Sequence, residues 1–296
     1  MHQNPAHSFL EKSPIGKTLV RLKEHYQDKT QLFDVSLKDN LGNSLLHLAI
    51  GGRFPVEAIE CLLQQGASIH DINCEGENCY GIALRGGFSV EYIRLFIQYD
   101  AHFKNSNPSF LAFVKSCILV GRWELIPDFL EGGFSPNFLF DEQQNLAQLL
   151  CCYSAPRLSP FYIEKMIAKG LDLSHVDSNG ETLLYIAIEQ KHPQVVEYLI
   201  QKTDCLKTMI HQQNHSGLSL LHLAILEARL ERPWIFSLIE SLIEHQASFC
   251  LKDLNDKTPL DYLDELENLE VKSIIEKLIF QTHIPQTSTE FKKIRI

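Results

Sequence analysis

One short segment occurs three times in this chain, loosely copied, and this self-similarity limits the possible folds more than any other feature. Its first copy reads Asp39-Asn-Leu-Gly-Asn-Ser-Leu-Leu-His-Leu-Ala49, and later copies cover 177–187 and 214–224. In addition, Gly76 lies 34 residues after Gly42 in an equivalent turn. Repetition at a spacing in the thirties is typical of stacked-repeat architectures, in which each repeat packs only against its neighbours. Such a chain needs no single spherical core.

The first copy predicts a turn followed by two helices. A Ser or Thr before the apolar run can accept backbone N–H bonds at a helix start, which places a short helix at 45–51. A second helix is expected over 55–64, where Ile59, Leu62 and Leu63 fall on one face. Gly66 can then end this helix with a positive φ. Residues 68–73 are expected to be an extended finger that leads to the next unit.

The three copies and the intact Thr258-Pro-Leu260 resemble the ankyrin repeat, whose mark is a Gly-x-Thr-Pro-Leu-His-x-Ala segment at the start of a helix pair. The resemblance implies an all-α ankyrin-repeat solenoid of about seven helix-turn-helix units, elongated and curved. It covers residues 34–280. It is strong in repeats one, five, six and seven, moderate in two, and weak in three and four.

Repeats three and four depart from the family pattern. In the third repeat, residues 121–137 still match an outer helix and the finger after it, but the front half is degenerate. In the fourth, 145–152 and 161–169 are expected to be the two helices. The stretch 153–160 between them carries two prolines, which block helix continuation and predict an enlarged loop.

Segments outside the repeats are expected to cap and extend them. Residues 1–33 form a predicted N-terminal capping segment. Within it, 14–26 forms an amphipathic helix that places Ile15, Leu19 and Leu22 against the apolar edge of the first repeat. Residues 281–296 are polar and are predicted to be a flexible C-terminal tail. The polar seventh repeat suits a terminal cap that faces water.

His47 and His222 are candidates for catalysis or metal binding, but the resemblance implies a structural role. In ankyrin repeats the matching histidine makes hydrogen bonds that tie the finger turn to its neighbours. Tyr185, Gly81 and Asp261 occupy the same place in other repeats, which a shared catalytic role would not permit. We therefore expect neither catalytic nor metal-ligating residues here.

Composition excludes several function classes. The chain has 27 basic and 37 acidic residues among 296, so the dense positive charge of a general nucleic-acid binder is missing. Its eight cysteines show no paired CxxC spacing, which argues against structural zinc. Phosphate-binding glycine loops are also absent, so no cofactor is expected. The N-terminus lacks a signal-peptide pattern and no run suits a membrane span, so a cytoplasmic location is predicted.

One enzymatic alternative stays open in the irregular middle, 104–177. Cys151 or Cys152 with His175 and Asp177 would provide the residue types of a cysteine nucleophile, a base and an orienting carboxylate. No family-specific motif surrounds the two cysteines, however, and they lie on an apolar helical run. Buried, inert thiols are the favoured interpretation.

The resemblance implies that a protein partner binds the concave face formed by the fingers and inner helices of a monomer. The residues expected to make contacts are Arg53, Glu77, Arg85, Phe138, Asn179, Glu189 and Leu226. Phe134, Phe138 and Phe140 are either exposed binding aromatics or packed against the loop at 153–160. The chain is also similar in style to ankyrin-repeat effectors of intracellular bacteria, which would place it in the host cytosol.

Overall fold

The computed structural model of the protein describes residues 13–28, 30–85, 90–99, 108–154, 158–201, 207 and 209–282. Over these ranges the regular elements are helices, and three isolated β-bridges each pair two residues that lie six positions apart, before the start of an inner helix. After the first helix they form seven inner and outer pairs, as the repeats predict. The helices are α2 (Pro14–His25), α3 (Leu45–Gly51) with α4 (Val56–Gln64), α5 (Cys79–Arg85) with α6 (Val90–Tyr99), α7 (Pro108–Leu119) with α8 (Ile126–Glu131), α9 (Leu146–Tyr153) with α10 (Pro160–Ala168), α11 (Leu183–Glu189) with α12 (Pro193–Ile200), α14 (Leu220–Ala228) with α15 (Pro233–Glu244), and α16 (Pro259–Asp264) with α17 (Leu269–Thr282), together with the 3₁₀ turns η1 (Trp123–Leu125) and η2 (Asp141–Gln143).

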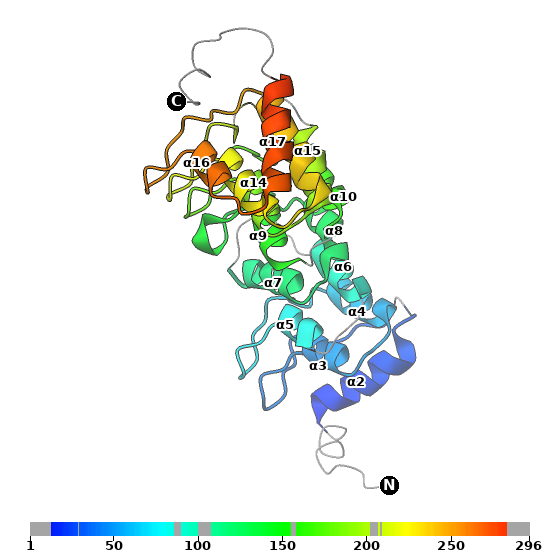
Figure 1. The fold of residues 1–296 in the computed structure, drawn as a ribbon. Coiled ribbons are helices and arrows are strands. Elements are labelled where there is room, and N and C mark those ends of the chain that lie inside the picture. The colour runs from blue at the N-terminus through cyan, green and yellow to red at the C-terminus, as the bar shows by residue number, and fades with distance from the viewer. Residues whose placement is uncertain are drawn as a thin grey trace, which may run out of the picture. The chain divides into compact units, whose positions relative to one another are not determined.

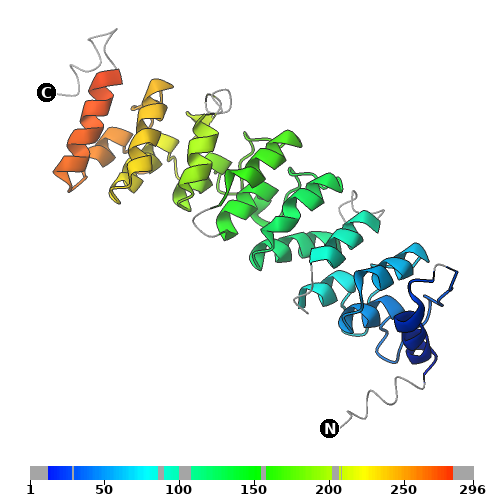
Figure 2. The same cartoon turned by 90° about the vertical axis from the view of Figure 1, so that its right-hand side faces the viewer.

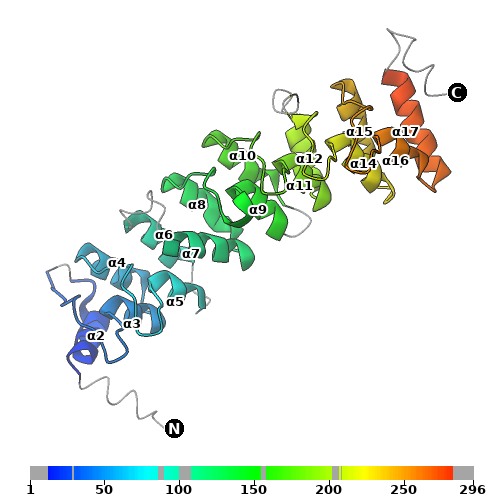
Figure 3. The same ribbon diagram turned by 90° about the vertical axis from the view of Figure 1, so that its left-hand side faces the viewer.

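The chain divides into two compact units, 1–134 and 135–296. In the first, α3, α5 and α7 form a row of inner helices, and α4, α6 and α8 form the outer row (Figure 1, Figure 3). Helix α2 begins at the N-cap Ser13, whose side chain accepts from the backbone of Gly16, and it packs against α3. Ile15 and Leu22 are buried there. Helix α2 therefore lies against the inner helix of the first repeat.

The third repeat, whose front half lacks the sequence motif, is built around aromatic rings. Phe110 of α7 lies 5.7 Å from the ring of Tyr80 in α5 and 5.9 Å from that of Phe129 in α8, measured between centroids. Phe134 packs edge-on against Phe110 at 5.8 Å and is buried. Of the two interpretations, the one in which Phe134 is an exposed binding aromatic is therefore wrong.

In the second unit, α9, α11, α14 and α16 form the inner row, and α10, α12, α15 and α17 form the outer row. Figure 2 shows these pairs following one another in chain order, from green α9 to red α17. Helix α17 ends at Thr282, just past the expected end of the repeats, and the tail at 283–296 lies outside the described residues. So do 155–157 in the predicted enlarged loop. None of the described helices has the length and apolar character needed to cross a membrane.

Candidate partner-binding surface

The fingers have a common internal structure. Each begins with an Asp or Asn whose Oδ1 accepts the backbone N–H groups two and four residues later. A residue with positive φ follows at the fourth position, such as Gly42 at 74°. This geometry favours glycine because it has no Cβ. The five fingers with this arrangement begin at Asp39, Asn73, Asp177, Asn214 and Asp253.

Neighbouring fingers are joined through their backbones. In the first unit the N–H of Cys74 donates to the carbonyl of Leu41 over 2.8 Å. In the second, His215 donates to Asn179 over 2.8 Å and Leu254 to Ser216 over 3.1 Å. The approach is so close that a Cβ on Gly217 would lie 2.7 Å from the Cα of Asp253. The described fingers that neighbour one another are therefore fixed to each other by their backbones.

His47 in α3 and His222 in α14 each tie their own helix to the finger that follows it in the chain. The Nδ1 of His47 accepts the backbone N–H of Ser44 over 3.1 Å, so its Nε2 carries the proton and donates to the carbonyl of Glu77 over 3.3 Å. His222 does the same with Ser219 and with the carbonyl of Lys257, over 3.1 and 3.2 Å. Burial lowers the pKa of both imidazoles, which keeps them neutral. The predicted structural role is confirmed.

A glutamine makes the same tie in the fourth repeat. The Oε1 of Gln148 accepts the backbone N–H of Asn145 over 3.0 Å, and its Nε2 donates to the carbonyl of Glu181 over 2.9 Å. Asn145 in turn caps α9 by accepting from the backbone of Gln148. Sequence analysis missed this tie. The signal that could have found it is the Asn-x-x-Gln spacing, which matches Ser-x-x-His in the first and sixth repeats.

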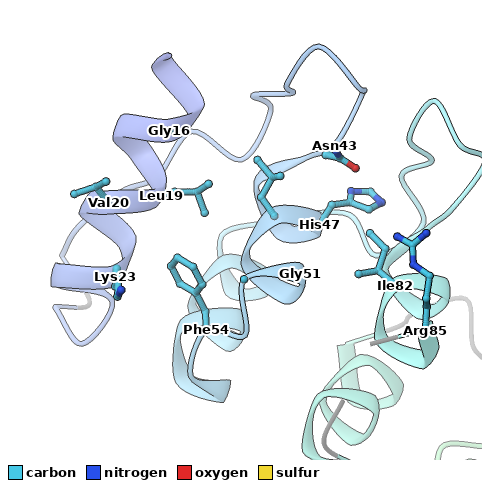
Figure 4. A pocket seen from close by; sticks show the side chains of 12 residues that line it. Gly16, Leu19, Val20, Lys23, Asn43, His47, Gly51, Phe54, Ile82 and Arg85 are labelled. Carbon is cyan, nitrogen blue, oxygen red and sulfur yellow. The ribbon is translucent and has the colours of Figure 1, made fainter. Parts of the chain in front are cut away.

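A groove of about 540 Å³ opens on the inner-helix side of the first unit. Figure 4 shows it bordered by α2, by the inner helix α3 and by the C-terminal end of α5 at Arg85. The Arg85 guanidinium is held by two finger carboxylates, with Nη2 2.9 Å from Glu77 and Nη1 3.4 Å from Glu75. Arg85 is thus fixed where finger, helix and groove meet.

The corresponding surface in the second unit is acidic. Burial, together with the nearby charges of Glu189 and Asp177, raises the pKa of Glu181 to about 7, although a hydrogen bond from Asn214 opposes this shift. Asn214 also donates to the hydroxyl of Tyr185 over 3.1 Å. Carboxylates at this density repel one another, so a cationic group docked beside them would be favoured.

The structure places the predicted contact residues in both units. In the first, Glu77 and Arg85 are joined by their ion pair. Arg53 is exposed, has a φ of 57° and directly follows Gly52, which lines the groove. The others belong to the second unit. Asn179 is exposed at a finger tip, Glu189 is exposed at the end of α11, Leu226 is half-buried in α14, and half-buried Phe138 faces the ring of Phe140 at 5.7 Å.

The alternative cysteine site does not assemble in the described residues. Cys151 is fully buried, and burial raises its thiol pKa far above the ordinary value. Burial raises the pKa of Cys152 to about 11, which disfavours the thiolate needed for attack. The Nε2 of His175 is engaged with the carbonyl of Gln143 at 2.7 Å instead. Seven described cysteines are free thiols, and Cys205 lies outside the described residues.

No group of three His, Cys, Asp or Glu side chains suited to a metal ion is found within the residues that the structure describes. The helix pairs, the linked fingers and the His or Gln ties define a protein of stacked helix-pair repeats. A sequence family described as "Ankyrin repeat" matches residues 41–74, and one described as "Ankyrin repeats (3 copies)" matches 149–253. The chain is an ankyrin-repeat protein. The comparison with curated proteins finds no match.

Proposed function

We propose that the chain is a non-enzymatic interaction module that holds a protein partner on its finger and inner-helix surface. Ankyrin repeats generally mediate protein–protein interaction, which supports the class of function. The observation that carries the proposal is the linkage of neighbouring fingers by backbone hydrogen bonds and of fingers to inner helices by His47, Gln148 and His222. A surface fixed before binding loses less conformational entropy when a partner docks.

The proposed contacts differ between the units. Arg53, Glu77 and Arg85 provide charged contacts beside the groove in the first. In the second, the acidic surface around Glu181 and Glu189 favours a partner segment that carries Lys or Arg. The remaining contacts proposed for the second unit are Phe138, Asn179 and Leu226.

The test is capture of proteins from cytosolic extract on the immobilised chain, with bound proteins quantified by mass spectrometry. Arg85→Glu and Glu189→Lys, each shown to fold by circular dichroism, should reduce a specific partner at least tenfold. The matched control is Glu240→Lys on the exposed side of outer helix α15, which should leave capture unchanged. Equal capture by all variants would place the partner elsewhere.

We further infer a cytoplasmic, monomeric protein, and we propose its delivery into a host cytosol because the sequence resembles ankyrin-repeat effectors of intracellular bacteria in style. Light scattering tests the oligomeric state, and a translocation reporter fused to the full chain tests delivery. A stable dimer, or a reporter retained in the producing cell, would remove the corresponding part of this proposal.

A further inference from the structure

The groove in the first unit has an apolar floor that the described residues leave open. Its apolar lining comes from α2, α3, α5 and the turn between α3 and α4, and consists of Leu19, Val20, Leu48, Phe54 and Ile82. Figure 4 shows Leu19 directed from α2 towards α3. Val20 is 45% exposed. At about 540 Å³ the groove is within the range of clefts of about 300–1,000 Å³ that enclose drug-sized ligands. It can therefore hold a few apolar side chains.

The charges along the groove have one sign. Two of its lining residues are charged, and both are cations: Lys23 on α2 and Arg85 on α5. Glu75 and Glu77 already balance Arg85. Lys23 makes no ion pair within the described residues, and Lys17 and Arg21 are exposed on the same helix. Helix α2 thus gives its side of the groove a positive potential in a chain whose net charge is −10.

The helix presents these residues in a regular stripe. Gly16, Leu19, Val20 and Lys23 follow the i, i+3, i+4, i+7 spacing of one helical face, and all four line the groove. Ile15 and Leu22 are buried side chains that attach the helix to the repeats, and Gly16 of the stripe is buried beside them. One part of α2 therefore anchors it, and a separate stripe faces the groove.

We propose that this groove is a docking site for an acidic, apolar peptide segment of a partner protein, with its apolar side chains on the floor and a carboxylate at Lys23. The inference deepens the interaction function proposed above and rests on it. An apolar floor matches apolar side chains by burial, and the Lys23 cation beside it, which has no ion pair among the described residues, matches a carboxylate. The partner's apolar residues determine affinity, and its acidic residue determines how the segment is oriented.

Gly51 provides a way to close the groove without disturbing the fold. It is exposed at the end of α3, lines the groove, and a Cβ added to it would meet nothing within 4 Å. Helical side chains lie over the preceding turn, so a larger side chain at this position would cover His47 and Leu48 on the groove floor. Gly51→Phe therefore fills the groove, and Gly51→Ala is its matched control.

The experiment is selection of a random peptide display library on the full chain, with counter-selection on Gly51→Phe, followed by fluorescence anisotropy on the enriched peptides. We expect peptides that combine apolar with Asp or Glu residues. Gly51→Phe should weaken their binding at least tenfold, and Gly51→Ala less than twofold. Lys23→Glu should weaken binding at least fivefold. Lys17→Glu, which makes the same charge change outside the lining, should weaken it less than twofold.

Three results would overturn the proposal: no enrichment over Gly51→Phe, enriched peptides that are basic, or equal effects of the two lysine variants. Enrichment that appears only after residues 1–12 are deleted would assign the groove to the chain's own N-terminal segment, and would overturn it too. Arg85 lines this groove and is altered in the capture experiment, but Glu189 lies in the second unit. Capture that is lost in Glu189→Lys and kept in Gly51→Phe therefore distinguishes failure of this inference from failure of the proposed function. Partner capture that persists when the groove is filled would leave the wider function intact.

Discussion

The fourth and sixth repeats begin their inner helices, α9 and α14, in the same way but with different side chains. Each helix starts with a capping box, and the third residue of the helix also contacts the next finger. The sixth repeat uses Ser219 and His222, as the family motif does. The fourth uses Asn145 and Gln148. The comparison shows that a tie from this position to the next finger does not need histidine itself, because a glutamine can make it too. A weak sequence match can therefore conceal an intact local geometry.

The third repeat extends the comparison, because its described residues are packed around aromatic rings. Phe110→Ala should have the largest effect of the changes considered, since the Phe110 ring is buried among Tyr80, Phe129 and Phe134. We expect a loss of about 3–5 kcal/mol in the free energy of unfolding, measured by denaturant titration. A loss below about 1 kcal/mol would show that the aromatic cluster does not hold this repeat together.

Next in size, His222→Ala and Gln148→Ala should each lower the free energy of unfolding by about 1–3 kcal/mol, because each leaves a finger carbonyl and a helix N-cap without their partner. The sharper test of equivalence is Gln148→His, which we expect to stay within about 1 kcal/mol of the parent. If Gln148→His were as damaging as Gln148→Ala, the two residues would not be interchangeable.

The smallest expected effect is a pH dependence at Glu181, the residue whose carbonyl the Gln148 tie reaches. Its folded pKa is raised from 4.5 to about 7. The folded state therefore binds more protons than the unfolded state between these values, so the stabilisation present below about pH 4.5 is lost as pH rises through 7. After allowance for solvent screening we expect about 1 kcal/mol between pH 5 and 8.

Glu181→Gln controls this measurement, because the histidine contributions are common to both proteins and cancel in the difference. The parent should lose stability relative to Glu181→Gln as pH increases. A difference that is flat with pH, or that runs the other way, would show that Glu181 titrates near its ordinary pKa.

Most of the fold followed from sequence, because the repeat motif specifies both helices and the finger at once. The helix bounds of the fourth repeat were predicted within a residue or two at 145–152 and 161–169, even where the motif fades. The role of Phe134 was not predictable. Its ring packs against Phe110 of α7, and Phe110 in turn contacts Tyr80 of α5, a helix that lies far away in the sequence.

The surface was less predictable than the fold. The fingers and inner helices were identified as a face, and the Arg85 position was correctly expected to be exposed there. The groove was missed, because it forms only when α2 packs beside α3, and no local pattern reports the space left between two helices. The stripe at Gly16, Leu19, Val20 and Lys23 was the available clue.

The central claim is that the finger and inner-helix surface holds a protein partner, and hydrogen–deuterium exchange on the chain with and without a captured partner tests it most directly. We predict slower exchange at the finger tips and inner helices, within 39–51 and 73–85 in the first unit or 177–190 and 214–228 in the second. The outer helices should be unchanged. Slower exchange confined to α4, α6, α10, α12 and α15 would contradict the account.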